Sequence, residues 1–294
     1  MTDKIAVVIV NYNGMEDTAA CIESIKKSDG TAELKIILVD NASTENEALK
    51  IQKLYPDIIT IRNEENCGFS AGNNIGIKAA LEDGCKFIML LNNDTVISPD
   101  MIELLRKECT TNTVVIPKML YYSKPETIWY DGGEINRWTG NAKNSNMGKL
   151  DDRSNSIRYC TFATGCCMMI NAAVFHNVGL LDEDYFMYCE DTDFCIRLSQ
   201  ASVQIKYVPA AKLWHKVSSS TGGSDSPFCI YYLTRNRLNY VKKYKEQFHM
   251  TAYPFTLMSR YIRMLQCKDE AKRKAYGDAI RDAKKGKIGR TKGY

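Results

Sequence analysis

Polar side chains that could bind a nucleotide stand directly after four apolar runs of this sequence. They are Asn11-Tyr12-Asn13, Asp40-Asn41, Asn63 to Asn66 and Asn92-Asn93-Asp94. Asn and Asp are common turn formers, which is enough to explain any one of these groups. Four groups at the same place relative to an apolar run favour a polar site large enough for a nucleotide.

The sequence has no glycine-rich loop of the kind that holds phosphates. Gly14 stands alone after the first apolar run, and neither G-x-G-x-x-G nor G-x-x-x-x-G-K-[ST] occurs. This disfavours a dinucleotide-dependent oxidoreductase and a P-loop kinase. Without such a loop a diphosphate needs cations, and Asp94 could hold a divalent metal ion that bridges phosphate oxygens.

An acidic cluster, Glu190, Asp191 and Asp193, opens a predicted helix over 190–201. Carboxylates are favoured at a helix N-terminus by the free amides and the helix dipole, and capping would explain one of the three, Asp193. Capping does not explain three acids, with three more at 182–184. The excess indicates a functional site.

The elements that must position these residues alternate regularly over the first 117 residues. Apolar runs predict strands at 5–10, 35–40, 58–62, 86–91 and 113–117. Amphipathic segments predict helices at 15–28, 45–54 and 70–81, and a fourth that opens at Ser98-Pro99. Strands that are apolar throughout and separated by helices indicate a parallel sheet covered on both faces. Ligands of such a sheet gather at the carboxyl ends of its strands, so the polar groups should meet there.

The second half of the chain is less regular. Residues 118–160 are polar and rich in Gly and Asn, which predicts a loop or an irregular hairpin. Beyond them we expect a strand over 161–170, helices over 171–177 and 190–201, and a strand over 204–209. Ser226-Pro227 has the cap and first-turn residues of a helix start. A long helix should begin there, followed by an amphipathic helix that includes 255–265 and by a basic end.

Charge is unevenly distributed along the chain. Residues 235–294 carry 17 Lys and Arg against 5 Asp and Glu, whereas residues 1–234 carry 22 against 30. A basic end on an acidic body suggests contact with a phosphate-rich surface, either membrane headgroups or nucleic acid. The 11 cysteines include no C-x-x-C pair, as expected of buried thiols in a reducing cytosol. No run approaches the roughly 20 apolar residues of a membrane span, so we expect a cytoplasmic protein.

Seven motifs, in order along the chain, resemble those of family 2 glycosyltransferases. Between about Ile5 and Tyr240 they read VVIVNYNG, ILVDNAST, NEENCGFSAGNNIGI, LLNNDTVI, TGCCMMI, GLLDEDYFMYCEDTDFCIRL and LWHKVSSSTG. The resemblance is greatest to the rhamnosyltransferase-like bacterial branch. It implies the GT-A fold, a Rossmann-like α/β arrangement whose mostly parallel central sheet is flanked by helices, and inverting transfer from a nucleotide sugar. The catalytic domain would span 1–225, with a nucleotide-binding half at about 1–117 and an acceptor-binding half at about 118–225, and 226–294 would be a basic helical extension.

This resemblance implies that the strand ends and the NCGFSAGNN motif bind the donor. Asp40 would accept hydrogen bonds from the base or ribose, and Gly165 would allow close backbone approach to the transferred sugar. The donor-binding residues implied are Asn11, Tyr12, Asn13, Asp40, Asn41, Asn66, Gly68, Asn74, Asn92, Asn93 and Gly165. The branch favours dTDP-rhamnose as donor, with UDP-hexoses and UDP-galactofuranose as alternatives.

The resemblance also implies roles in metal binding and catalysis. Asp94 matches the last acid of the family's Asp-x-Asp metal motif, whose first acid is Asn92 here. One carboxylate would hold Mn²⁺ or Mg²⁺ more weakly and would need the diphosphate as a further ligand, so metal dependence is open. His215, a turn histidine by context alone, matches a residue that contacts the metal or diphosphate. Asp191 would be the base that takes the acceptor proton, and Glu190 would hold the acceptor or orient the base.

The acceptor side is less specific. Trp129, Asp131 and Trp214 are candidate contacts for a glycan or lipid-linked acceptor. The amphipathic, basic residues 253–290 either rest on the inner face of the plasma membrane or pack on the domain. The sequence is compatible with a homodimer, and it does not favour nucleic acid as a partner.

Two other classes of protein compete with a glycosyltransferase. A nucleotidyltransferase should have a basic, Gly-rich loop near its N-terminus for a triphosphate, and VNYNGMEDTAA has none. A non-catalytic sugar-binding module would have no use for the acidic cluster.

Overall fold

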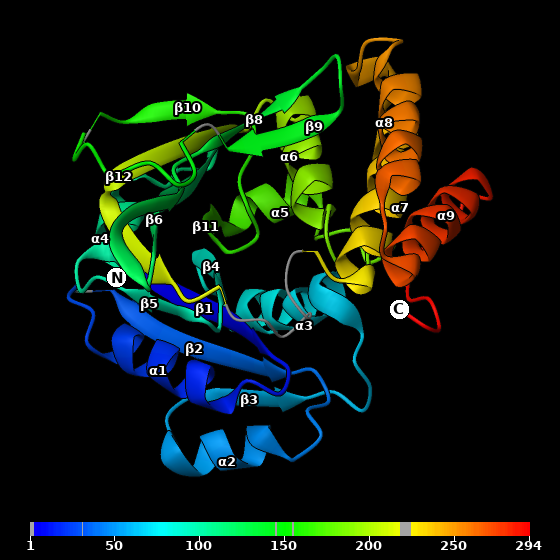
Figure 1. Ribbon diagram of the computed structural model, residues 1–294. Helices are drawn as coiled ribbons and strands as arrows, with labels where there is room; N and C mark the ends of the chain where they lie inside the picture. Colours follow the sequence, from blue (N-terminus) through cyan, green and yellow to red (C-terminus); the bar gives the residue numbers. More distant parts are fainter. Residues whose placement is uncertain (1–2, 31, 145, 155, 218–224) are drawn as a thin grey trace.

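The computed structural model describes residues 3–30, 32–144, 146–154, 156–217 and 225–294. Its N-terminal half is a parallel sheet built as the sequence predicts (Figure 1). The four strands are β1 (Lys4–Asn11), β2 (Glu33–Asp40), β3 (Ile59–Arg62) and β4 (Phe87–Asn92). The helices between them are α1 (Met15–Lys26), α2 (Glu47–Leu54) and α3 (Gly68–Glu82).

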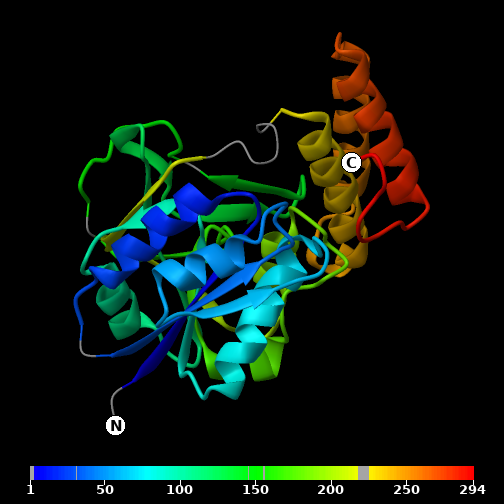
Figure 2. The same cartoon turned by 90° about the horizontal axis from the view of Figure 1, so that it is seen from below.

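Helices cover both faces of this sheet, as Figures 1 and 2 show. On one face Thr18 of α1 donates to the Asn11 side chain at 2.8 Å. On the other face α3 packs so closely that a Cβ at Gly72 would lie 3.0 Å from Val10. Successive residues of a strand point to opposite faces, which is why Val10 and Asn11 contact different helices.

The sheet continues past β4 with strands that make it mixed. β11 (Cys167–Asn171) runs antiparallel to both β4 and β6 (Thr113–Tyr121), and β12 (Gln204–His215) runs parallel to β6. The strand order is β10-β12-β6-β11-β4-β1-β2-β3, in which β10 is Arg158–Cys160. Two further strands are attached, β5 (Thr95–Ile97) to β12 and β7 (Lys124–Tyr130) to β6. The sheet is therefore mostly parallel, as expected, with an antiparallel insertion at its centre.

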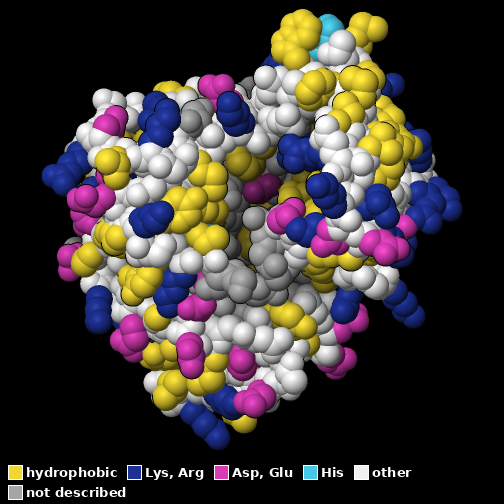
Figure 3. All heavy atoms as spheres, viewed as in Figure 1, with side chains coloured by type: hydrophobic (Ala, Val, Ile, Leu, Met, Phe, Trp, Pro, Cys, Tyr) yellow, Lys and Arg dark blue, Asp and Glu magenta, His cyan; other side chains and the backbone are white. Residues whose placement is uncertain are grey.

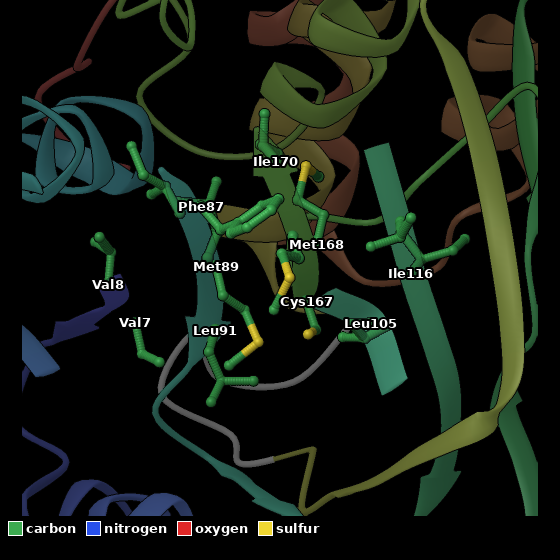
Figure 4. Close-up of a cluster of buried hydrophobic side chains, with 14 of the residues drawn as sticks. Val7, Val8, Phe87, Met89, Leu91, Leu105, Ile116, Cys167, Met168 and Ile170 are labelled. Atoms are coloured by element: carbon green, nitrogen blue, oxygen red, sulfur yellow. The ribbon is translucent and has the colours of Figure 1, made fainter. Parts of the chain in front are cut away.

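Side chains from the central strands form the main core. Figure 4 shows one part of it, contributed by β1, β4, β6, β11 and the helix α4 (Met101–Glu108). Its buried members include Val7, Val8, Phe87, Met89, Leu91, Leu105, Ile116, Cys167, Met168 and Ile170. Because β1 and β4 are apolar from their second and first residues, respectively, up to a final Asn, their polar site residues lie at the carboxyl ends of the strands.

Three details of the predicted elements are wrong. A short strand, β5 (Thr95–Ile97), precedes α4 (Met101–Glu108), so this helix begins after Ser98-Pro99 rather than at them. The strand expected over 161–170 is only β11, because residues 161–166 adopt turn and extended geometry. Residues 118–160 contain more strand than a loop would. The end of β6 lies in this segment, and it is followed by β7 (Lys124–Tyr130), β8 (Gly133–Asn136), β9 (Asn141–Asn144) and β10 (Arg158–Cys160). The strands β8 and β9 form a hairpin.

The remaining helices complete the molecule. Between β11 and β12 the chain forms α5 (Ala172–Val178) and α6 (Glu190–Gln200). The C-terminal part consists of α7 (Pro227–Lys243), η1 (Lys245–Gln247), α8 (Ala252–Gln266) and α9 (Glu270–Lys284). Ser226 caps α7 with Pro227 in the first turn, as predicted. Among the described residues no helix combines the length and the apolar character needed to cross a membrane.

The C-terminal helices dock on the body of the protein. Asn236 of α7 donates to the backbone oxygens of Met187 and Tyr188, both at 2.8 Å. The chain end returns to the same region, where Gly289 N–H donates to Asp184 at 2.8 Å. The segment before α6 is therefore held between the sheet and the C-terminal helices.

Candidate active site

The carboxyl ends of β1, β2 and β4 lie side by side, as the sequence predicts. Asn11 is opposite Asp40, and Asn92 is opposite Val10. Nδ2 of Asn11 donates to Oδ1 of Asp40 at 3.2 Å, and Oδ1 of Asn11 accepts from Asn93 at 3.4 Å. Polar groups that follow three different strands thus form one connected network.

A second set of contacts joins β2 to the start of α3. Nδ2 of Asn41 donates to Asn66 Oδ1 at 2.9 Å and to the backbone oxygen of Gly68 at 3.0 Å. Gly68 has a φ of +87°, and a Cβ there would collide with the backbone oxygen of Phe186. That oxygen accepts from Phe69 N–H at 2.8 Å. Only glycine permits this approach of the donor wall to the segment before α6.

Asp40 is fully buried and already bonded to protein groups. Its Oδ1 accepts from the Ser43 backbone N–H at 3.3 Å and from the Ser43 hydroxyl, and Oδ2 lies 3.5 Å from Nη1 of Arg62. The Tyr12 ring is exposed and the Arg62 side chain is about one-third exposed. Tyr12 and Arg62 therefore give this wall an aromatic ring and a cation within reach of a ligand.

β5 and β12 bring Asp94 and His215 together. β5 begins directly after Asp94 and pairs antiparallel with β12, so that His215 is opposite Thr95. Nε2 of His215 lies 3.0 Å from Oδ1 of Asp94, although 121 residues separate them in sequence. The two residues predicted to contact the metal or diphosphate therefore occupy one place.

The surroundings of His215 favour a positive charge on its ring. Burial acts to lower the pKa of His215, but the Cys166 thiol and the Asp94 carboxylate outweigh it and raise this pKa to about 10. The Trp129 ring packs edge-on against the imidazole, with 4.2 Å between centroids. Nδ1 of His215 is buried and has no hydrogen-bond partner among the described residues. A protonated His215 therefore has one ring N–H for which the described residues supply no acceptor.

Asp94 and His215 are also the residues that could ligate a divalent ion. In the part of the chain that the structure describes, no three His, Cys, Asp or Glu side chains are grouped to hold a metal. The Asn93 amide donates to Thr18 at 3.0 Å, which ties it to α1. Two protein ligands fit a metal that is completed by the donor's own diphosphate oxygens, as a hard cation allows.

Glu190 and Asp191 lie at the start of α6, next to the backbone of Gly165. Oδ2 of Asp191 accepts from Gly165 N–H at 3.2 Å, and Oδ1 accepts from Thr192 N–H at 2.7 Å. Glu190 is buried, and its Oε2 has no hydrogen-bond partner among the described residues. A Cβ on Gly165 would lie 3.0 Å from the Phe69 ring and 3.8 Å from Oε1 of Glu190. The absence of a side chain at 165 keeps the space beside both carboxyls open.

Different hydrogen bonding separates the two carboxyl groups. Burial raises the pKa of Asp191, but bonds from Gly165 and Thr192 stabilise its ionised form. Burial raises the pKa of Glu190 well above its usual value, and the charge of Asp191 adds to this. Asp191 therefore ionises first, while Glu190 retains its proton to a higher pH.

Residues 165 and 166 connect the acids to the Asp94–His215 pair. Gly165 N–H bonds Asp191, and the adjacent Cys166 adjoins the His215 ring. The Cys166 backbone oxygen accepts from Asn92 N–H at 2.8 Å. Neighbouring Cα atoms are about 3.8 Å apart, so the predicted carboxylate base and the predicted diphosphate contacts lie within one substrate's length. Figure 3 shows the surface hollowed at the centre of this face, with an acidic side chain inside the hollow.

Three predicted site residues are held elsewhere. Asn74 bonds Leu181 and Glu183 and ties α3 to the segment before α6. Asp131 is buried and bonded to Arg158 and Asn146. Trp214 alternates with His215 along β12, so its ring is on the other face, where it donates to Pro125 at 3.3 Å. The structure does not bring these three to the hollow.

Several polar residues of the site were not predicted from the sequence. Glu47 accepts from Asn11 Nδ2 at 2.8 Å and from Gly14 N–H at 3.1 Å, which fixes the turn after β1. Arg62 could have been found, because it ends β3 opposite Asp40. Cys166 carried no local signal, because it reads as one more apolar residue of a buried strand.

The geometry is accompanied by a clear family relationship. The chain belongs to glycosyl transferase family 2, whose family model matches residues 6–179. It is 29% identical over 240 residues to the low-salt glycan biosynthesis hexosyltransferase Agl10 of Haloferax volcanii, covering 81% of this chain and 75% of that protein. It is 24% identical over 254 residues to the dTDP-rhamnosyl transferase RfbF of Shigella flexneri, covering 83% and 81%. It is also 24% identical to the N-acetylglucosaminyl-diphospho-decaprenol L-rhamnosyltransferase of Mycobacterium tuberculosis, covering 76% and 79%.

Solved structures confirm the fold. GalNAc-T7 with UDP, GalNAc and Mn²⁺ superposes with a TM-score of 0.65 at 16% identity, covering 97% of this chain and 56% of that one. TarS of S. aureus superposes with a TM-score of 0.60 at 14% identity, covering 95% and 80%. The fold is that of GT-A glycosyltransferases, and the chain is a glycosyltransferase.

Proposed function

We propose that this glycosyltransferase inverts the anomeric centre of a nucleotide-diphosphate sugar, with dTDP-rhamnose as the leading donor. The acceptor is a hydroxyl group of a glycan or lipid-linked sugar in bacterial cell-surface polysaccharide synthesis. The observation that carries the proposal is the continuous path Asp191–Gly165–Cys166–His215–Asp94, which joins a half-buried carboxylate to the Asp94–His215 ion pair.

The proposed reaction needs one proton acceptor and one group that stabilises a leaving diphosphate. The acceptor oxygen forms a bond to the anomeric carbon from the face opposite the nucleotide, and its proton passes to the Asp191 carboxylate. The bond from the anomeric carbon to the diphosphate oxygen breaks, and the His215 imidazolium donates to that oxygen. Glu190, kept protonated by burial, donates a hydrogen bond to the acceptor sugar.

A divalent ion would supply further positive charge at the leaving diphosphate when it is bound. Asp94 is the carboxylate that would hold it, with His215 beside it. Solved GT-A neighbours contain Mn²⁺ together with a nucleotide or nucleotide sugar, which supports Mn²⁺ or Mg²⁺. His215 as imidazolium and His215 as metal ligand are alternatives, since a ligating nitrogen must be unprotonated.

The choice of donor rests on relatives and on the wall that Tyr12 and Arg62 provide. Two of the relatives carry rhamnosyl transfer in their names, and one is a hexosyltransferase, so the UDP-hexoses and UDP-galactofuranose are the competing donors. Thermal-shift screening with dTDP-rhamnose, UDP-glucose and UDP-galactofuranose tests this. A ligand present at 100 times its Kd stabilises the native state by about 2.7 kcal/mol. Stabilisation by the UDP sugars without dTDP-rhamnose would reject the proposed donor.

The C-terminal helices provide a surface suited to the inner face of a membrane. α8 exposes a row of apolar side chains, Phe255, Met258, Ile262 and Leu265. Figure 3 shows apolar side chains gathered over α8, with Lys and Arg side chains around them. An amphipathic helix with basic surroundings binds anionic headgroups in this way.

Liposome co-sedimentation tests this surface. Truncation after Tyr240 would remove the chain that buries Tyr231 and Tyr232, so point substitutions are preferable. The double variant Met258→Ser, Leu265→Ser should lose binding to anionic vesicles, and Met250→Ser, an exposed control before α8, should keep it. Equal sedimentation of wild type and double variant would reject membrane contact through α8, and the monomer mass by light scattering would then show whether a homodimer covers this row.

A further inference from the structure

Two arginines beside the catalytic acids have no anionic partner. Arg237 belongs to α7 and Arg260 to α8. Neither forms an ion pair within the described ranges, and Nε of each is buried without a hydrogen-bond partner there. Nη1 of Arg237 donates to Asn141 Oδ1 of the β8–β9 hairpin at 2.8 Å. Arg260 is only 9% exposed.

Neighbouring cations of this region have more protein partners than the pair, although Nη2 of Arg235 is also buried without one among the described residues. Lys243 bonds Asp182 and Asp193, and Arg235 donates to Gly289 and Thr291. By contrast, burial and the neighbouring charges of Arg237 and Arg263 lower the pKa of Arg260 to about 10. A buried, unpaired cation is costly, and proteins retain one mainly where a ligand supplies the opposite charge.

The pair lies on the α7–α8 side of the acids, away from β5. Burial raises the pKa of the Cys189 thiol, which directly precedes Glu190. The nearby charges of Arg237 and Arg260 act to lower this pKa, and those of Asp191 and Glu190 act to raise it. Burial likewise raises the pKa of the Tyr240 phenol, and nearby Arg237 lowers this pKa while Asp191 raises it. Figure 1 shows α7 and α8 on the far side of the molecule from β5, the strand that begins directly after Asp94. The arginines are therefore next to the acceptor's approach to Asp191, and on the other side from the proposed donor diphosphate.

We propose that Arg237 and Arg260 bind the phosphate of a phosphate-linked acceptor, and specifically the diphosphate that joins the acceptor sugar to a lipid carrier. This inference rests on the proposed function and adds to it the class of acceptor and its binding residues. Guanidinium groups match phosphate oxygens with paired hydrogen bonds, and partial burial strengthens them. The sugar attached to this diphosphate would reach Asp191 and Glu190.

The lipid source, rather than a soluble sugar phosphate, follows from α8 itself. Arg260 is on the inner face of this helix, and the apolar row of Phe255, Met258, Ile262 and Leu265 is on its outer face. A phosphate bound inside α8 and a hydrocarbon chain that passes over α8 into the membrane would belong to one molecule. A soluble sugar phosphate would make no use of that row.

Binding of farnesyl diphosphate to the full chain tests the inference. Titration calorimetry in saturating dTDP keeps the donor site filled. Farnesyl diphosphate should bind wild type, inorganic diphosphate should bind more weakly, and farnesol should not bind measurably. Arg237→Gln and Arg260→Gln should each weaken farnesyl diphosphate by at least about tenfold, since each removes a charged hydrogen bond. Arg273→Gln, an exposed arginine of α9, is the matched control and should change nothing.

The outcomes separate this inference from the proposed function. Failure of wild type to bind any nucleotide would overturn the function itself. Normal dTDP binding with equal farnesyl diphosphate affinity in wild type and in the Arg237→Gln, Arg260→Gln double variant would overturn only the arginine site. Equal, arginine-dependent affinities for inorganic and farnesyl diphosphate would overturn the lipid carrier and indicate a soluble sugar phosphate. The Arg260→Gln variant should melt no lower than wild type, so lost binding cannot be attributed to unfolding.

Discussion

The two walls of the active site differ in how completely their polar groups are bonded. Along the ends of β1 to β4 the amides and carboxylates bond one another, as Asn11, Asp40 and Asn41 do. On the opposite wall, buried atoms of Glu190, His215, Arg237 and Arg260 have no partners among the described residues. Every buried side-chain atom identified as unpaired belongs to a residue after position 117.

This difference indicates that the first wall is preorganised, whereas the polar groups of the second wall would be fully bonded only when a ligand is present. Fully bonded polar groups stabilise a fixed shape, which suits a nucleotide pocket used for every substrate molecule. Buried groups without partners lower stability and persist where a ligand or transition state completes them. Substitutions on the first wall should therefore cost mainly stability, and those on the second should cost mainly activity or binding.

The largest effect is expected at Asp191. Asp191→Asn removes the proton acceptor but keeps the shape, so kcat should fall by about 10²–10⁴-fold while the Kd for dTDP is unchanged. Steady-state kinetics and calorimetry measure the two quantities. The control is Asp184→Asn, which changes an exposed acid just before the acidic cluster and should retain wild-type kcat. Normal turnover by Asp191→Asn would remove this residue from the mechanism.

The next largest effect should be on donor affinity. His215→Gln removes the charge next to Asp94, and loss of a charged hydrogen bond to the diphosphate should raise the Kd for the donor by about 10–100-fold. The melting temperature should fall as well, because the variant removes the charge that His215 places beside the buried Asp94 carboxylate, so donor affinity is measured well below the melting temperature of the variant. His176→Gln on α5 is the exposed control. A large loss of stability with unchanged donor affinity would contradict the contrast between the walls.

Gly68 tests the preorganised wall. Gly68→Ala places a Cβ against the Phe186 backbone in addition to the strain of a positive φ, and should lower the free energy of unfolding by about 1–3 kcal/mol. Gly84→Ala, also at positive φ but with no atom within 4 Å of the added Cβ, measures backbone strain alone. Chemical denaturation compares the two variants. Equal losses would mean that the close approach to Phe186 contributes nothing.

The smallest effect concerns Glu190 and depends on pH. The raised pKa means that folded Glu190 binds a proton more tightly than unfolded Glu190, so its contribution to stability is present below about pH 4.5, the ordinary value, and is lost as pH rises through the higher folded pKa. Glutamine does not ionise, so the Glu190→Gln variant does not lose this contribution as pH rises. The free energy of unfolding of the variant should therefore increase relative to that of wild type with rising pH, by at most about 1.4 kcal/mol per pH unit. Melting curves from pH 5 to 8 measure this, with Glu246→Gln as an exposed control. A gain independent of pH would show that Glu190 is ionised in the folded protein.

Much of the first half of the chain could be predicted, because its signals are local. An apolar run followed by Asn or Asp identifies both a strand and the polar residue at its carboxyl end. Parallel pairing then places these end residues side by side, as with Asn11 and Asp40. The segment over 118–160 was harder, because short, polar strands such as β8 and β9 lack a hydrophobic period.

The site residues divide in the same way. The chain's motifs predict site roles for Asp94, Asp191 and His215, and the structure brings these three near one another. Asp131 and Trp214 were also expected at the site but are held elsewhere. Strand alternation puts Trp214 on the face opposite His215, which could be worked out only once β12 was known to extend through both.

What the amino-acid sequence determined by itself is the alternation of strands and helices, the order of the motifs and the polar residues at the strand ends. Only the tertiary structure decided that Asp94 meets His215, that Gly165 and Cys166 connect this pair to Asp191, and that two arginines of a basic tail lie beside the acids. The physical reason is that periodicity and capping depend on residues a few positions apart. Burial, charge compensation and pKa depend on neighbours that only the folded chain brings into contact.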